Sequence, residues 1–147
     1  MAQVHSVKEM RDLGEKVSSQ LQRGDLLILS GELGAGKTAF TQGIGRGLGI
    51  SEITSPTFVI SRIHHGRIPL IHVDAYRLIQ SPGVFLEFED LDLPSKMSEA
   101  ITVIEWGSDL APLLKDEFLE IKIEFISDTE RSLEFIPHGP RWRGFKL

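Results

Sequence analysis

The segment Gly31–Thr38 reads Gly-Glu-Leu-Gly-Ala-Gly-Lys-Thr and fits the pattern G-x-x-x-x-G-K-[ST] of a Walker A phosphate-binding loop. In such a loop, backbone N–H groups surround phosphate oxygens, the lysine reaches the β- and γ-phosphates, and the next hydroxyl binds Mg²⁺. Lys37 and Thr38 hold those two positions. The motif needs a strand before it and a helix after it. The sequence predicts that strand at Leu26–Ser30 and that helix at Lys37–Leu48. The sequence therefore predicts a nucleoside triphosphate site at a strand-to-helix turn.

Short-range patterns predict the elements around this loop. Ser6 and Glu9 form a capping box, and apolar residues recur behind it at helical spacing, so Ser6–Leu21 is predicted to be an amphipathic helix. Phe58–Ile63 and Ile68–Val73 are rich in branched residues and flank a turn, which predicts a β-hairpin. The other predicted elements are a strand at Ile101–Ile104, an antiparallel pair at Leu119–Ile126 and Ser132–Ile136, a short helix or ordered loop at Val84–Leu93, and a frayed tail from Pro137 onward.

This mixture of helices and strands contains too few β-α-β units for a large doubly wound sheet. The predicted fold is therefore α/β, a P-loop NTPase-like three-layer fold with a mixed central sheet and an appended β-hairpin. The chain has 147 residues, which suits a single domain spanning 1–147 with one core.

Composition narrows the function classes. The formal net charge of −5 argues against a free-standing, non-specific nucleic-acid binder, although it allows action on RNA inside a larger assembly. The chain has no cysteine, which excludes disulfides, a thiolate nucleophile and cysteine-bound zinc. No apolar run approaches the length of a signal peptide or a membrane span, so the expected location is the cytoplasm and no membrane partner is expected.

Hydrolysis or transfer of a phosphoryl group needs a carboxylate near the phosphate loop, at the end of a neighbouring strand. Asp74 ends the apolar run that begins at Ile68, and Glu105 ends the run that begins at Ile101. Both acids are candidate catalytic residues. One would act on the metal or its water shell and the other on the attacking water, and the residues alone leave these two roles unassigned.

Other residues allow two interpretations each. Ser55–Thr57 could reach over the γ-phosphate as a nucleotide switch, or could form an ordinary turn with hydrogen-bonding side chains. His72 alternates with apolar neighbours and could face either the site or the polar side of the sheet. Trp106 could stack on a base, although packing in the core is the commoner use of tryptophan.

The class of nucleotide follows from what the sequence contains and lacks. A guanine-specific GTPase carries an Asn-Lys-x-Asp motif, and this chain contains no asparagine. A small P-loop kinase carries a lid with paired arginines, whereas the corresponding region here is acidic. ATP is therefore the expected nucleotide.

Several motifs together resemble the TsaE (YjeE) family, small bacterial ATPases of tRNA threonylcarbamoyladenosine synthesis. The resemblance covers about Ser6 to Arg131. Besides the Walker A loop, it rests on four stretches in matching order and spacing, which are Asp12–Glu15, Ser55–Phe58, His72–Leu78 and Ile104–Trp106.

The resemblance implies roles for residues and for partners. It implies that Thr38 and Glu105 bind Mg²⁺, that Asp74 is needed for ATP hydrolysis and that Ser55–Thr57 acts as a switch. It also implies that the protein works with a TsaB–TsaD pair, which transfers threonylcarbamoyl to adenosine 37 of tRNAs reading ANN codons. ATP hydrolysis would reset that pair, and tRNA would be met only through it. The residues expected at the nucleotide are Ser6, Glu32, Leu33, Gly34, Ala35, Gly36, Lys37, Thr38, Thr57 and Arg131.

Two other functions fit a phosphate loop in a chain of this size. One is a small-molecule P-loop kinase, and the other is a nucleotide-dependent binding module without significant turnover. Phosphate release from Mg-ATP, measured with and without TsaB–TsaD, separates all three.

Overall fold

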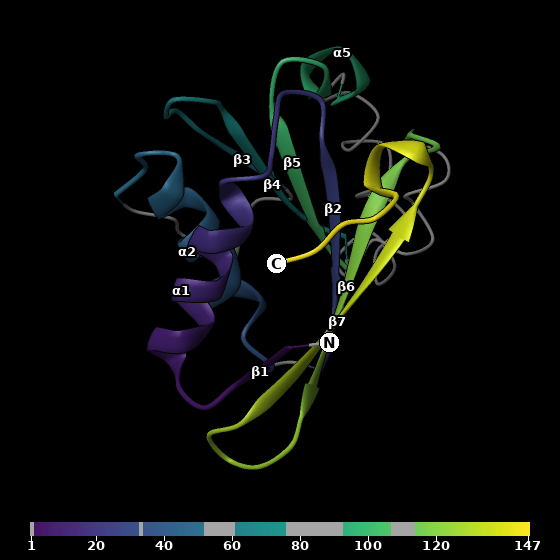
Figure 1. Cartoon of the computed structure of the whole chain (residues 1–147). Helices are drawn as coiled ribbons and strands as arrows, with labels where there is room; N and C mark the ends of the chain where they lie inside the picture. Colours follow the sequence, from purple (N-terminus) through teal and green to yellow (C-terminus); the bar gives the residue numbers. More distant parts are fainter. Residues whose placement is uncertain (1, 33, 52–60, 76–92, 107–113) are drawn as a thin grey trace.

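The computed structural model describes residues 2–32, 34–51, 61–75, 93–106 and 114–147. Within these residues the strands form one sheet of seven, in the order β1-β7-β6-β2-β5-β4-β3 (Figure 1). The elements are β1 (Ala2–Val4), α1 (Val7–Ser18), β2 (Leu26–Ser30), α2 (Lys37–Gly47), β3 (Ser61–His64), β4 (Leu70–Asp74), α5 (Leu93–Met97), β5 (Ile101–Glu105), β6 (Phe118–Phe125), β7 (Arg131–His138) and the 3₁₀ helix η1 (Pro140–Trp142).

The four central strands, β6, β2, β5 and β4, run parallel to one another. Their carboxyl ends therefore meet at one edge of the sheet, which is where α/β proteins bind ligands. Antiparallel strands extend both sides, with β3 paired to β4 and with β7 and β1 continuing from β6. The predicted mixed sheet and α/β class are confirmed. The predicted hairpin is present as β3 and β4, and it forms the edge of the same sheet.

The first two helices have the predicted positions. The Ser6 hydroxyl accepts a hydrogen bond from the backbone N–H of Glu9 at 3.1 Å, so the predicted cap starts α1 at Val7. Both helices lie on one face of the sheet, side by side (Figure 1). Glycines allow this close approach, because a Cβ on Gly14 would lie 2.2 Å from the carbonyl oxygen of Phe40 and one on Gly43 would lie 2.0 Å from that of Arg11.

Successive side chains of the central strands point to opposite faces of the sheet, so apolar side chains form a core on each face. Leu27 and Leu29 of β2 point toward α1 and α2, in a cluster that also includes Phe40 and Trp142. Leu26 and Ile28 point to the opposite face, in a second cluster that includes Met97 of α5. Because apolar side chains cover both faces of β2, this strand is a continuous apolar run in the sequence.

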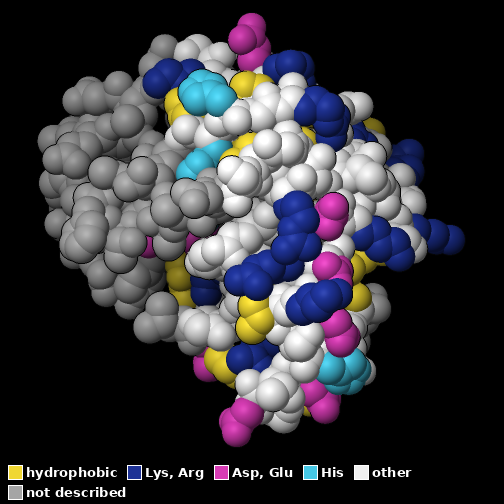
Figure 2. Space-filling model, turned by 90° about the vertical axis from the view of Figure 1, so that its left-hand side faces the viewer, with side chains coloured by type: hydrophobic (Ala, Val, Ile, Leu, Met, Phe, Trp, Pro, Cys, Tyr) yellow, Lys and Arg dark blue, Asp and Glu magenta, His cyan; other side chains and the backbone are white. Residues whose placement is uncertain are grey.

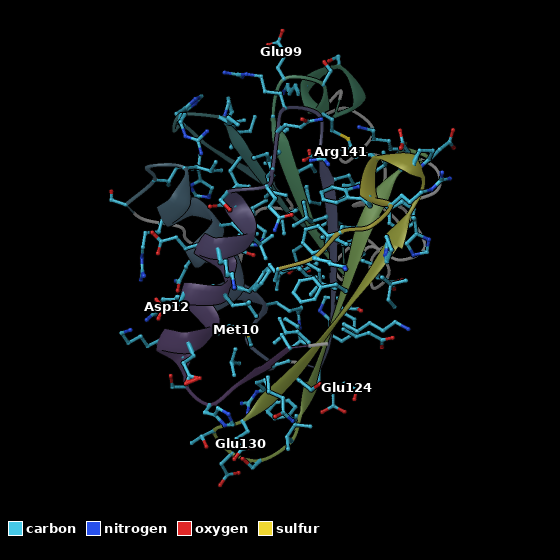
Figure 3. All side chains as sticks on the ribbon, in the orientation of Figure 1. Met10, Asp12, Glu99, Glu124, Glu130 and Arg141 are labelled. Carbon is cyan, nitrogen blue, oxygen red and sulfur yellow. The ribbon has the colours of Figure 1, made fainter. Side chains whose placement is uncertain are left out.

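The predicted frayed tail is wrong. Strand β7 continues to His138, and η1 then buries the Trp142 side chain to 1 % exposure. The Arg141 guanidinium donates to both carboxylate oxygens of Asp25, at 3.0 and 2.9 Å. Figure 3 shows Arg141 at the end of the sheet opposite the β6–β7 turn, where Glu130 lies. An aromatic anchor and an ion pair therefore hold the tail in place.

Other elements agree with the sequence within one or two residues. β2 has its predicted bounds, β5 extends its predicted run by one residue, and β6 and β7 form the predicted antiparallel pair. The short strand β1 was not predicted. Most of the predicted element at Val84–Leu93 lies outside the described residues.

The outer surface of α1 and α2 carries charges of both signs (Figure 2). Lys8 pairs with Asp12, and Arg46 pairs with Asp12 and Glu15. This face is therefore not a single-sign surface of the kind that attracts nucleic acid by charge alone. Among the described residues, no helix is both long enough and apolar enough to cross a bilayer.

Candidate functional site

The predicted phosphate loop lies between β2 and α2, and its backbone conformation depends on glycine. Gly36 stands at the N-cap of α2 with φ 110°, in the left-handed region that residues with a Cβ rarely adopt. A Cβ there would also lie 2.9 Å from Cε of Met10. No side chain of the described residues caps this helix end. The first N–H groups of α2 are thus available to an anion, and the helix dipole favours negative charge there.

Lys37 lies inside the loop and is held by it. Its ammonium donates to the carbonyl oxygens of Gly31 at 2.7 Å and Glu32 at 3.0 Å, and only 5 % of the residue is exposed. Burial lowers the pKa of Lys37 below its usual value of 10.5, and the negative charges of Glu105 and Asp74 partly oppose this shift. Both acids are therefore close enough to act electrostatically on the lysine.

The two predicted acids stand side by side at the carboxyl edge of the sheet. Asp74 of β4 is in register with Glu105 of β5, and Glu105 is in turn in register with Leu29, near the end of β2 that leads into the loop. Asp74 is half-buried, and Glu105 is 6 % exposed. The sheet thus places two carboxylates and the loop lysine in one small region, as the sequence predicted.

A buried histidine contacts one of these acids. His72 Nε2 lies 2.8 Å from Glu105 Oε2, and the His72 side chain is fully buried. His72 precedes Asp74 by two residues on β4, so both side chains point to the same face of the sheet. Of the two interpretations that the sequence left open for His72, the structure supports the one in which it faces the site.

Trp106 also belongs to this region. Its ring centre lies 4.6 Å from Lys37 Nζ, which is within the range of a cation–π interaction. Its backbone N–H donates to the carbonyl oxygen of Leu29 at 2.8 Å, and its φ of 62° is in the left-handed region. The tryptophan contacts the loop lysine and is only partly buried.

A pocket adjoins the loop on the side of α1. Its volume is about 280 Å³, close to the lower end of the range for small-molecule sites. Three separate parts of the chain line it, which are the start of α1, the phosphate loop with α2, and the turn between β6 and β7. The lining residues are His5, Ser6, Val7, Met10, Gly34, Ala35, Gly36, Ala39, Asp128, Thr129 and Arg131.

The guanidinium of Arg131 is tied to the turn that precedes β7. It donates to the carbonyl oxygens of Ser127 at 2.7 Å and Glu130 at 2.9 Å, and it stacks on the Phe125 ring with a separation of 4.0 Å. These contacts hold the turn together beside the pocket. Arg131 thus lines the pocket from a fixed position.

The structure brings most of the predicted site residues together. Ser6, Gly34, Ala35, Gly36 and Arg131 line the pocket. Lys37 and Thr38 begin α2, and the Glu32 carbonyl accepts from Lys37. Leu33 and the switch candidate with Thr57 lie outside the described residues.

Some residues of the site were missed from the sequence. Val7, Met10, Asp128 and Thr129 line the pocket, but no local pattern marks them. Their positions depend on how α1 and the β6–β7 turn pack against the loop. Gly14 and Gly43, which allow the two helices to approach closely, are the sequence feature that could have placed α1 there.

Thr38 at the start of α2 and Glu105 at the end of β5 carry oxygen atoms of the kind that bind a hard cation. Among the described residues, no three His, Cys, Asp or Glu side chains are grouped as an all-protein metal cage would need. Mg²⁺ does not need one, because it is held by one or two protein oxygens together with phosphates and water. The hydroxyl of Thr38 and the carboxylate of Glu105 are oxygen donors of that kind.

Comparisons with known proteins agree on one family. A family model described as "Threonylcarbamoyl adenosine biosynthesis protein TsaE" matches residues 4–133. A Streptomyces coelicolor protein named tRNA threonylcarbamoyladenosine biosynthesis protein TsaE is 44 % identical, over 90 % of this chain and 93 % of its own. A Bacillus subtilis protein of the same name is 36 % identical, over 92 % and 84 %. The crystal structure of Bacillus subtilis YdiB superposes with a TM-score of 0.76 and 31 % identity, over 97 % of this chain and 87 % of that one.

Proposed function

The chain belongs to the TsaE family, and from this membership we propose that it is a Mg²⁺-dependent ATP-binding protein and weak ATPase acting in tRNA threonylcarbamoyladenosine biosynthesis. The observation that carries the proposal is the arrangement of Lys37, Asp74 and Glu105. A phosphate-loop lysine lies within the electrostatic influence of two strand-end carboxylates. This is the set of groups that phosphoryl chemistry needs.

The loop and α2 would hold the phosphates. The uncapped N–H groups at the start of α2 provide donors, and Lys37 provides a positive charge. Lys37 would exchange its hydrogen bonds to Gly31 and Glu32 for bonds to phosphate oxygens. An ammonium attracts a negatively charged phosphate oxygen more strongly than a neutral carbonyl oxygen, so this exchange would favour phosphate binding.

Thr38 and Glu105 would hold Mg²⁺, which supplies charge neutralisation at the phosphates when bound. Asp74, the neighbour of Glu105 in register, would accept a hydrogen bond from the attacking water. This assignment of roles follows the family resemblance, and the closeness of the two carboxylates supports it.

The pocket beside the loop would take the base and sugar of ATP. It adjoins Gly34, Ala35 and Gly36, so a nucleotide with its phosphates in the loop can extend into it. Val7, Met10 and Ala39 give it apolar walls suited to a purine ring. Its polar lining side chains are those of His5, Ser6, Asp128, Thr129 and Arg131.

The expected partner is a TsaB–TsaD-type complex, and the protein would contact tRNA only indirectly, through that complex. Hydrolysis would reset that complex and would not carry out the transfer. The net charge of −5 and the mixed charges on the face over α1 and α2 support an indirect relation to RNA. A cytoplasmic location stays a prediction.

The test is phosphate release from Mg-ATP by the purified chain, with and without TsaB–TsaD. Slow release that the partners stimulate is the expected result. Stoichiometric transfer of phosphate to a metabolite would replace the proposal with a kinase. Tight binding of ATP without release under either condition would leave only a nucleotide-dependent binding module.

A further inference from the structure

We propose that His72 is a positioning residue that fixes the carboxylate of Glu105 for Mg²⁺. The inference rests on the proposed function, because it assigns a role around the metal site that this function requires. It concerns a contact between two side chains of this chain, His72 Nε2 and Glu105 Oε2, which are 2.8 Å apart.

The burial of the pair makes this contact strong. His72 is fully buried, and the Glu105 side chain is 8 % exposed. A hydrogen bond to a charged carboxylate in such surroundings is stronger than one at the surface, because little water competes for it. The bond therefore restricts Glu105 to one orientation of its side chain.

The geometry of a carboxylate explains how this bond would serve a metal. His72 engages Oε2, and a carboxylate has a second oxygen, Oε1, that can face a cation or one of its waters. Side chains that hydrogen-bond to metal ligands in this manner orient the ligand and raise metal affinity. A Glu105 free to rotate would have to be ordered each time Mg²⁺ binds.

The other ring nitrogen argues against a purely structural histidine. His72 Nδ1 is buried and has no hydrogen-bond partner among the described residues. His72 is in register with Val103, whose apolar side chain lies on the same face of the sheet, and an apolar residue in place of His72 would avoid the cost of the unpaired Nδ1. The contact with Glu105 is what the histidine provides and an apolar residue could not.

Two kinds of variant separate the hydrogen bond from the space that the ring fills. His72→Gln keeps an N–H donor at a similar reach, whereas His72→Phe keeps a ring without a donor, and His72→Leu serves as a second apolar variant. Thr102→Val is the matched control, because it removes another buried polar atom from the neighbouring strand β5 without touching Glu105.

The experiment titrates Mg²⁺ into each full-length variant with a non-hydrolysable ATP analogue and measures heat of binding. His72→Phe is expected to raise the half-saturating Mg²⁺ concentration about 10- to 100-fold. His72→Gln and Thr102→Val are expected to stay close to the wild type. Thermal unfolding of each variant confirms that it is folded.

The proposal is overturned if a folded His72→Phe or His72→Leu binds Mg²⁺ as well as the wild type does. It is also overturned if His72→Gln is as impaired as His72→Phe, or if both apolar variants fail to fold. Failure of the proposed function looks different, because it appears in the wild type as an absence of Mg²⁺-dependent nucleotide binding or of phosphate release.

Discussion

Lys37 Nζ lies 4.6 Å from the centre of the Trp106 ring and donates to two carbonyl oxygens of the predicted phosphate loop. Trp106 immediately follows Glu105 in the chain, so the residue that contacts Lys37 is next to the acid at the end of β5. The left-handed backbone at Trp106, with φ 62°, costs free energy that a glycine would not incur. The ring contact with Lys37 is a reason for a tryptophan to stand there.

The buried ammonium of Lys37 makes stability depend on pH. Burial lowers its pKa below 10.5, so between the folded and unfolded pKa values the unfolded chain binds a proton that the folded chain has released. The free energy of unfolding therefore rises with pH through this window, up to about 10.5. We expect the wild type to gain stability relative to Lys37→Met as pH rises from 7 toward 10.5, measured by urea unfolding at several pH values. If the difference in unfolding free energy between the two proteins stayed constant with pH, burial would not lower the pKa of Lys37 as described.

The pocket beside the loop offers a test of where the base binds. Ala39 lines this pocket from α2, and a phenylalanine there would occupy much of its volume. We expect Ala39→Phe to weaken ATP binding by at least about tenfold, which corresponds to roughly 1.4 kcal/mol. Inorganic triphosphate should bind to Ala39→Phe as tightly as to the wild type, because the loop that would hold it is unchanged. Equal loss of both ligands would mean that the variant disturbs the loop itself.

The contact between α1 and α2 depends on glycine. A Cβ on Gly43 would lie 2.0 Å from the backbone oxygen of Arg11, and backbone cannot move aside as a side chain can. Gly43→Ala gains about 1 kcal/mol of helix propensity but must overcome an overpacking cost of about 1–3 kcal/mol or more. We expect a net loss of stability in urea unfolding, with exposed Lys16→Ala as the control in α1. A more stable Gly43→Ala would show that the helices can separate without cost.

The docked tail depends on the pair of Arg141 and Asp25. Asp25 is 3 % exposed, and Arg141 donates to both of its carboxylate oxygens. Arg141→Ala leaves this buried acid with the backbone N–H of Gln22 but without its charged partner, which costs on the order of 3 kcal/mol. We expect a lower unfolding temperature and faster proteolysis after His138, whereas exposed Arg143→Ala should behave as the wild type. A tail that stays protected in Arg141→Ala would show that the buried Trp142 alone is sufficient.

The sequence predicted those parts of the molecule that depend on neighbouring residues. The capping bond of Ser6, the glycine at the start of α2 and the apolar run of β2 are local, and each has the predicted place. The acids Asp74 and Glu105 were found because each ends an apolar run, and parallel strands then bring their ends together.

The parts that were missed depend on residues far apart in the sequence. Trp142 is buried because β7 returns its segment to the face that α1 covers, and Arg141 meets an acid 116 residues away. Strand β1 has three residues and pairs with the distant strand β7. The contact between His72 and Glu105 depends on the register between β4 and β5, which no local pattern in the sequence specifies.

The most direct test of Gly31–Thr38 as the nucleotide site is calorimetric titration of Mg-ATP into the wild type and Lys37→Met, with exposed Lys16→Met as the control. We expect the wild type to bind one ATP per chain. We expect Lys37→Met to weaken binding by more than about tenfold, because charge-assisted hydrogen bonds of roughly 1.5–3 kcal/mol each are lost. We expect no change for Lys16→Met. Equal affinity of Lys37→Met and the wild type would contradict the assignment of Gly31–Thr38 as the nucleotide site.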